Sequence, residues 1–238
     1  MLHSFDKLVI TMSDILEIIA HCPLFKNYSS LQIREFLAAT NYSINRYKKN
    51  QLIFRMDQPI THVGIILTGS VEVQKVIQSG RMINLIYKEK GEIIAEGTVF
   101  STIPTYPCQV SSRETTDVLL LPKQYMFQAL GCNPNLLTNL LQLMSDKLIM
   151  LNTKIELLSY CSIQSKIAFS LLHCISQNPM AHEIELPYSK KAWAEHLNVP
   201  RPSLCRELRN LCKTDIITLN KRTITIVNRS QLEAMLNE

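Results

Sequence analysis

Arg201, Ser203 and Arg206 lie in a short segment that opens with Pro200 and whose leucines recur at helical spacing. A proline in the first turn costs a helix little, because that amide has no partner there. The leucines predict an inward face, which leaves the three polar side chains on the outward N-terminal half. Guanidinium groups suit guanine edges and phosphates, so this helix is predicted to contact duplex DNA. The inward residues are Leu204, Leu208 and Leu211.

A shorter helix, about Lys190–Leu197, is predicted just before this segment. Ser189 can cap it by accepting from a free amide. Ala194 is small enough to let a second helix cross closely, and Asn198 tolerates the left-handed turn that such a crossing needs. The pair therefore reads as a helix-turn-helix. A plain αα-hairpin that packs and binds nothing is the alternative.

Two β-rich runs, residues 216–219 and 223–227, follow the helices and predict a wing whose turn, residues 220–222, is basic. From residue 186 to 238 there are nine Lys and Arg against five Asp and Glu, whereas residues 1–185 hold sixteen against fifteen. The chain's formal charge of +5 is thus concentrated around the motif. Because neutralising phosphates is the main sequence-independent term in DNA affinity, this excess favours DNA binding.

A heptad pattern over residues 137–158 precedes the predicted helix-turn-helix region. Apolar residues spaced alternately by four and three favour two supercoiled helices, and hence a parallel homodimer on a palindromic site. Asn133 can cap this helix, Pro134 stands at its start, and Ser159 and Tyr160 end the pattern. A single long core helix is the alternative. The seam residues are Leu137, Leu141, Met144, Leu148, Leu151, Ile155 and Leu158.

Residues 45–122 alternate short β-rich runs with turns, and Gly69, Gly80 and Gly91 recur every eleven residues. This spacing is typical of an antiparallel double-sheet roll able to hold a small ligand. The expected class is α+β: a β-roll with N-terminal helices over 1–132, a dimerisation helix over 133–160, and a winged helix-turn-helix over 161–238.

The composition excludes several classes of protein. At 238 residues and 46% hydrophobic content, two domains can each bury a core. Acidic and basic residues interrupt the first twenty positions and no apolar run reaches eighteen, so neither a signal peptide nor a membrane span is expected, and we expect a cytoplasmic protein. Seven cysteines without metal-ligand spacing predict free thiols.

In its order of β-roll, long helix and winged helix-turn-helix, the chain resembles the family of the cyclic-AMP receptor protein and the fumarate-nitrate reduction regulator. Three stretches carry the likeness: residues 91–97 are similar to the phosphate cassette, 162–171 to the hinge and first DNA-domain helix, and 199–208 to the recognition helix. The resemblance implies that Arg201 and Arg206 contact bases. It also implies that Ser189, Lys191 and Ser203 hold phosphates.

Two departures from the family pattern bear on DNA and effector recognition. Pro202 stands where many members have a glutamate that reads cytosine, so a different half-site is implied. Glu96 is retained, but Tyr106 and Pro107 replace the Arg-Ser pair that holds a cyclic phosphate. The hydroxyl pair on the dimer helix is replaced by Leu151 and Asn152.

We therefore expect that cyclic AMP is not a strong ligand and that the effector is unidentified. An uncharged or weakly acidic metabolite is one alternative, and a constitutive regulator without effector is another. An iron–sulfur cluster is not expected, since only Cys22 precedes Cys108; haem on His62 or Cys108, or a redox thiol, stays a weaker alternative. The candidate effector pocket comprises Glu96, Gly97, Tyr106, Cys108 and Asn152.

Two alternative functions belong to other classes of protein. A metal-binding or enzymatic, cupin-like roll would gather several histidines and a carboxylate, whereas only His62 falls among the predicted strands. No catalytic motif accompanies it, so no enzyme is expected. A dimerisation scaffold without DNA binding would leave Arg201 and Arg206 idle. RNA polymerase is a further expected partner of a regulator, and no membrane partner is expected.

Overall fold

The computed structural model describes residues 10–77, 81–177, 183–185 and 189–237. Gly80, one of the three regularly spaced glycines, and Leu186, the first residue of the basic region, lie outside these ranges. The chain divides into two compact units, residues 1–146 and 147–238, and the boundary falls within one continuous helix, α4 (Pro134–Ser159). Each unit has its own hydrophobic core.

The first unit begins with two helices, α1 (Met12–Ala20) and α2 (Ser30–Ala39), joined through the short helix η1 (Pro23–Phe25). Thr11 and Ser29 start the two helices with reciprocal capping boxes, in which each side chain accepts from the third helical amide. The apolar faces of both helices pack into the core of the first unit, as the sequence predicted.

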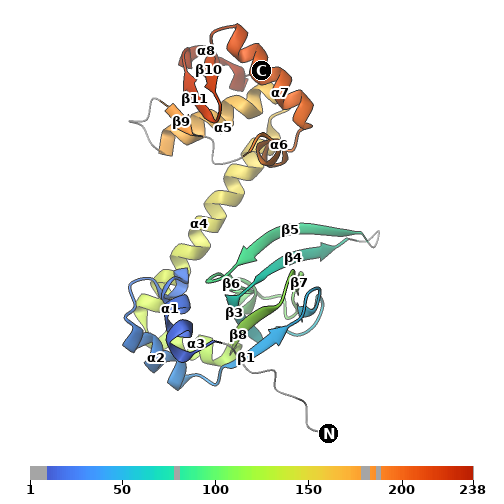
Figure 1. The fold of residues 1–238 in the computed structure, drawn as a ribbon. Helices are drawn as coiled ribbons and strands as arrows, with labels where there is room; N and C mark the ends of the chain where they lie inside the picture. The colour runs from blue at the N-terminus through green and yellow to red at the C-terminus, as the bar shows by residue number, and fades with distance from the viewer. Residues whose placement is uncertain (1–9, 78–80, 178–182, 186–188, 238) are drawn as a thin grey trace. The chain divides into compact units, whose positions relative to one another are not determined.

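Two four-stranded antiparallel sheets form the β-roll, which confirms the predicted fold class (Figure 1). One sheet has the order β1-β8-β3-β6 and the other β2-β7-β4-β5. Their strands are β1 (Ser43–Tyr47), β2 (Leu52–Phe54), β3 (His62–Thr68), β4 (Ser70–Val76), β5 (Met82–Glu89), β6 (Ile93–Ile94), β7 (Gln109–Ser112) and β8 (Thr116–Pro122). The short helix η2 (Thr98–Phe100) follows β6, and α3 (Lys123–Cys132) follows β8.

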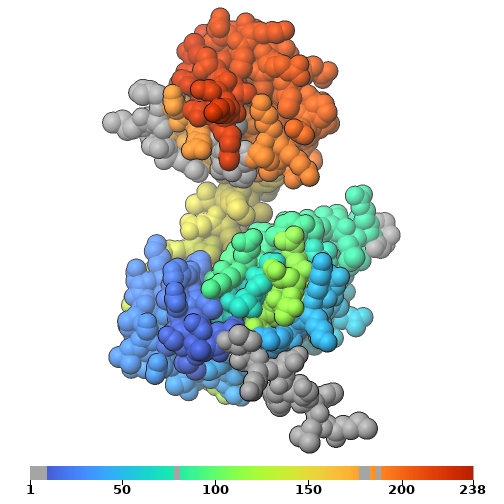
Figure 2. Space-filling view, viewed as in Figure 1, coloured from blue at the N-terminus to red at the C-terminus, as the bar shows by residue number. Residues whose placement is uncertain are grey.

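Gly69 makes the tight connection from β3 to β4 possible. Its φ of +73° is readily available only to glycine, and a Cβ there would lie 2.6 Å from the Thr115 carbonyl oxygen. The hairpin that follows, β4–β5, stands out from the first unit as an arm (Figure 2). Its outer strand β5 is an edge strand with exposed apolar side chains: Met82, Ile83, Leu85, Ile86 and Tyr87.

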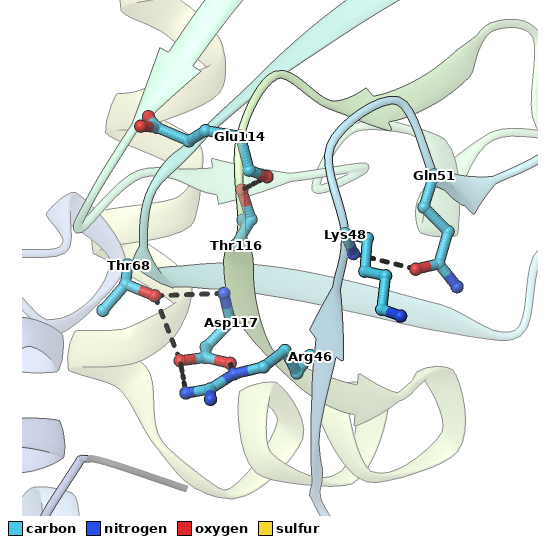
Figure 3. Close-up of polar contacts among 7 residues, drawn as sticks. All are labelled: Arg46, Lys48, Gln51, Thr68, Glu114, Thr116 and Asp117. Carbon is cyan, nitrogen blue, oxygen red and sulfur yellow. Dashed lines mark hydrogen bonds and ion pairs between the residues drawn. The ribbon is translucent and has the colours of Figure 1, made fainter. Parts of the chain in front are cut away.

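A buried ion pair ties β1 to β8 (Figure 3). Arg46 Nε donates to Asp117 Oδ1 over 2.8 Å and Arg46 Nη2 donates to Asp117 Oδ2 over 2.9 Å. Thr68 from β3 donates to the same carboxylate over 3.1 Å. The three strands are thereby joined through one carboxylate whose side chain is 3% exposed.

The second unit packs the end of α4 with the winged helix-turn-helix. Its core joins Leu157 of α4 to side chains from helices and from a three-stranded sheet of order β10-β11-β9. The elements are α5 (Ile163–Gln177), β9 (Glu183–Glu185), α6 (Lys190–Leu197), α7 (Arg201–Lys213), β10 (Ile217–Asn220), β11 (Thr223–Ile226), α8 (Arg229–Ala234) and η3 (Met235–Asn237).

Candidate nucleic-acid interface and effector region

The turn between α6 and α7 has the geometry that the sequence predicted. Ser189 Oγ accepts from the Ala192 amide over 3.2 Å and so caps α6. Asn198 adopts the left-handed conformation, with φ of 54°, and ends that helix. Ala194 is buried, and its carbonyl accepts from the Val199 amide over 2.9 Å, which closes the turn.

Helix α7 presents a cationic face opposite its buried leucines. Leu204, Leu208 and Leu211 are fully or almost fully buried, whereas Arg201 and Arg206 are exposed. The Arg206 side chain is 69% exposed, and its Nε lies 3.9 Å from Glu207 Oε1, near the outer limit of an ion pair. Glu207 also accepts from Gln164 over 3.0 Å. The outward position of Arg206 leaves the guanidinium able to meet a ligand beyond the helix.

The remaining predicted DNA contacts lie around the same two helices. Ser189 and Lys191 are exposed at the start of α6, Pro202 is exposed in the first turn of α7, and Ser203 beside it is half-buried. The Ser189 hydroxyl oxygen already accepts its capping bond but keeps a proton to donate to a phosphate.

In the first unit, Glu96 is buried beside a lysine. The Lys88 ammonium from β5 donates to Glu96 Oε1 over 3.0 Å and also to the carbonyl of Ile93. Both side chains are at most 9% exposed, so the two charges compensate each other in a region poor in water. The Glu96 carboxylate is therefore already engaged by a cation from within the chain.

The other members of the predicted effector pocket have different surroundings. Tyr106 is buried, stacks on Phe54 with ring centroids 4.7 Å apart, and donates its hydroxyl to the His62 carbonyl over 2.9 Å. Cys108 is half-buried, and burial raises the pKa of its thiol, which disfavours the reactive thiolate. Asn152 is exposed on the part of α4 that belongs to the second unit.

Gly97 lines an apolar groove in the first unit. The groove has a volume of about 470 Å³ and is bounded by η2, α3 and the first half of α4. A Cβ on Gly97 would lie 3.6 Å from Met144 Sδ, so this position faces α4. The remaining lining residues are Phe100, Phe127, Leu130, Gly131, Leu137, Leu140 and Leu141.

The predicted seam lies along α4 and is largely exposed in the single chain. Asn133 caps the helix by accepting from the Leu136 amide over 3.2 Å, as predicted. Leu148, Leu151 and Ile155 are each more than half exposed. The seam is thus an apolar stripe that the described part of the chain leaves uncovered over much of its length.

Comparison with known families accounts for both units. Residues 44–131 match the family model of the cyclic nucleotide-binding domain. Residues 165–235 match that of the Crp-like helix-turn-helix domain. The chain belongs to the Crp/Fnr family. This regulator therefore pairs a DNA-binding domain with an effector-type domain, and the resemblance inferred from the sequence is confirmed.

Relatives span most of the regulator. The Global nitrogen regulator of Synechococcus elongatus is 25% identical over 196 residues, which cover 78% of this chain and 86% of the relative. The cAMP-activated global transcriptional regulator CRP of Salmonella typhimurium is 21% identical over 186 residues, covering 77% and 89%. The crystal structure of Thermus thermophilus Catabolite Activator Protein matches with a TM-score of 0.53 at 18% identity, covering 90% and 98%.

Three residues of the regulator that lie near the predicted sites were not among the predicted residues. Arg209 and Lys213 continue the exposed cationic face of α7, three and seven residues beyond Arg206. Their helical spacing was a sufficient signal. Lys88 was missed because its pairing with Glu96 depends on the turn after β5, and no local periodicity reports such a contact.

Among the described residues, no three His, Cys, Asp or Glu side chains gather as a metal site. Nor does the described part of the chain contain a helix long and apolar enough to cross a membrane.

Proposed function

We propose that this regulator acts as a homodimer that binds a palindromic duplex DNA site, and that an effector other than cyclic AMP controls it. The exposed cationic face of α7 over a buried leucine core carries the proposal. In a helix-turn-helix, the second helix lies in the major groove with its N-terminal residues on base edges. Arg201 and Arg206 occupy that part of α7.

The homodimer follows from the exposed seam. Burying an apolar stripe along two parallel helices removes it from water and places two recognition helices about one turn of DNA apart. Homodimeric symmetry is then mirrored in the half-sites. Because the proposed target is DNA, we place the action of this protein in the cytoplasm. We propose that it has no catalytic role. RNA polymerase is the further partner that we propose.

Selection of binding sites from randomised duplex DNA, using the ligand-free protein, tests the proposal. We expect an enriched palindrome. Arg206→Ala should then lose about 1–3 kcal/mol of specific binding free energy. It should also weaken the sequence preference at one base position in each half-site. Leu31→Ala, an exposed change on α2, is the matched control and should bind unchanged. Enrichment of single half-sites, or unchanged binding by the Arg206 variant, would contradict the proposed reading mode.

The effector proposal rests on the charges around Glu96. Neither Tyr106 nor Pro107 supplies a cation for a cyclic phosphate, and Lys88 is neutralised by Glu96 itself. Calorimetric titration with cyclic AMP should therefore show no tight binding, and a micromolar or stronger dissociation constant would refute this part. Selection of a palindrome by the ligand-free protein would mean that the effector is optional or inhibitory.

A further inference from the structure

The apolar groove beside Gly97 shares three residues with the seam. Leu137, Leu141 and Met144 line the groove and also occupy seam positions. Neighbouring Leu136 and Leu140 point into the core of the first unit and are at most 5% exposed. Helix α4 thus carries more apolar side chains than the core of the first unit buries, and the remaining ones line the groove.

Two exposed aromatic rings form the far wall of the groove. Phe100 of η2 is 39% exposed and Phe127 of α3 is 46% exposed. Their ring centroids lie 4.8 Å apart in an edge-to-face arrangement, which is a favourable geometry for an aromatic pair. Aromatic side chains that are ordered before binding lose little freedom on association, and such residues often dominate interface energies.

Charge is absent from this stretch of α4. Residues 134–145 include no Asp, Glu, Lys or Arg, whereas residues 146–159 include Asp146, Lys147, Lys154 and Glu156. Depletion of charge together with exposed aromatic rings distinguishes the buried centre of a protein interface from ordinary surface. The first half of α4 therefore has the composition of an interface centre.

We propose that a second copy of this chain covers the groove, so that the dimer interface extends from α4 onto Phe100 and Phe127 of the first unit. The inference rests on the proposed homodimer and adds to it a contact outside the coiled coil. The groove is continuous with the seam, and a two-fold interface brings the same apolar stripe of the second copy against it. Since η2 follows Glu96 and Gly97 directly in the chain, the dimer contact and the effector region then share one short segment.

Sedimentation equilibrium over a range of protein concentrations tests this inference. The double variant Phe100→Ser/Phe127→Ser should raise the dimer dissociation constant by at least about tenfold, the scale expected from truncating central interface residues. Leu31→Ser is the matched control, because Leu31 is 65% exposed on α2 away from the groove, and it should dimerise normally. Phe100→Leu/Phe127→Leu keeps the surface apolar and should restore most of the affinity, and circular dichroism verifies that each variant is folded.

A seam variant separates this inference from the proposed dimer. Ile155→Asp places a charge on the coiled coil and should give monomers. Weakened dimers in both the Ile155 and the double-phenylalanine variants support the extended interface. If Ile155→Asp dissociates the dimer while the double variant matches the wild type, the groove contact is refuted and the coiled coil stands. If neither change weakens association, the α4 dimer and the extension both fail.

An apolar fluorescent dye gives an independent readout. The groove should bind the dye in the Ile155→Asp monomer and lose it in the wild-type dimer, where a second copy covers the site. Adding Phe100→Ser/Phe127→Ser to Ile155→Asp should abolish dye binding, which assigns the signal to the groove. Equal dye binding at this site in monomer and dimer would mean that the groove stays open to a small apolar ligand, and would overturn the inference.

Discussion

Ala95 adopts a backbone conformation that alanine rarely takes. Its φ is +64°, in the left-handed region, and it directly precedes the buried Glu96. In the described part of the chain, the other left-handed residues that are not glycine are Asn27, Asn50, Asp57, Asn198, Asp215 and Lys221, most of which are Asn or Asp. Those types tolerate the conformation, whereas an alanine there stores strain of about 1 kcal/mol. The strained position lies where the chain turns to present Glu96.

Ala95→Gly should therefore stabilise the protein by up to about 1 kcal/mol, because glycine adopts a positive φ without the Cβ clash. Urea denaturation measures the change. Ala129→Gly in α3 is the control of opposite sign, since glycine within a helix costs about 1 kcal/mol. A destabilised Ala95→Gly protein would show that the alanine methyl group contributes more packing than the strain removes.

Asp117 makes stability depend on pH. The hydrogen bond from Arg46 is the largest cause that holds the pKa of this carboxyl below its ordinary value of 3.8, against the opposing effect of burial. A pKa lower in the folded than in the unfolded state gives stability that is complete above the unfolded value. That stability is lost as the pH falls through the folded value.

Asp117→Asn should cost about 3 kcal/mol at pH 7, because Arg46 loses its buried partner. The stabilities of wild type and variant should converge as the pH falls from 3.8 through the lower pKa of the folded state, where the wild-type carboxyl takes up its proton. Urea denaturation at several pH values tests this, with the exposed Glu35→Gln as the control. A difference between wild type and variant that does not shrink in acid would place the contribution of Asp117 in packing rather than in charge.

At the scale of elements, the end of α4 is built into the DNA-binding unit. Leu157 is 2% exposed within the second core, and the Lys154 ammonium donates to the His196 carbonyl in the last turn of α6. A cation there also meets the negative end of the α6 dipole. The contacts of α4 with the helix-turn-helix thus begin before Ser159 and Tyr160, where the predicted heptad pattern ends.

Lys154→Met keeps the aliphatic stem and removes the hydrogen bond. The variant should lose about 1.5 kcal/mol of stability in the second unit. Specific DNA affinity should fall several-fold, while dimerisation is unchanged. Lys166→Met is the matched control, because the charge of Lys166 disfavours the charged form of Lys154, so its removal should not destabilise the protein. Wild-type DNA affinity in the Lys154 variant would show that the bond does not position α6.

Elements with a local signal were predictable and those that depend on distant partners were not. The sequence placed α6 at its observed bounds and identified the leucine face of α7, because both follow from capping and helical spacing. Strand β1 was missed, since its sequence Ser-Ile-Asn-Arg-Tyr is polar and its Arg46 is satisfied by Asp117, 71 residues away. Strand β9 was missed for a similar reason, because its three residues are ordered by pairing with β11.

The same distinction holds for the functional regions. The side chains predicted to contact DNA lie at the start of α6 and on α7, two consecutive helices, so their spacing could be read directly from the sequence. The effector region depends on contacts between segments, and there the fold pairs Glu96 with Lys88 and packs Tyr106 on Phe54. Composition records which groups are present but not which of them already have partners.

At the scale of the whole molecule, the uneven charge predicts a steep dependence of DNA binding on salt. The logarithm of the binding constant falls with the logarithm of salt concentration, with a slope of about 0.9 for each neutralised phosphate.

Lys221, exposed at the tip of the wing, is the position that tests this dependence. Because a homodimer carries two copies, Lys221→Gln should reduce the slope by about 2, whereas a monomer would lose about 1. Binding titrations at several salt concentrations measure the slope, with Lys26→Gln in the first unit as the control. An unchanged slope would exclude the wing tip from the phosphate contacts.

The continuity of α4 also limits how the length of this protein can change over evolution. Each residue inserted into an α-helix rotates everything after it by about 100°. A single insertion near the boundary at residue 146 would therefore turn Leu151, Ile155 and Leu158 away from the stripe formed by Leu137 and Leu141. Seven inserted residues add almost two whole turns and return the stripe to phase. Natural length variation within this helix is accordingly expected in steps of seven residues, and single-residue indels should be confined to the loops outside it.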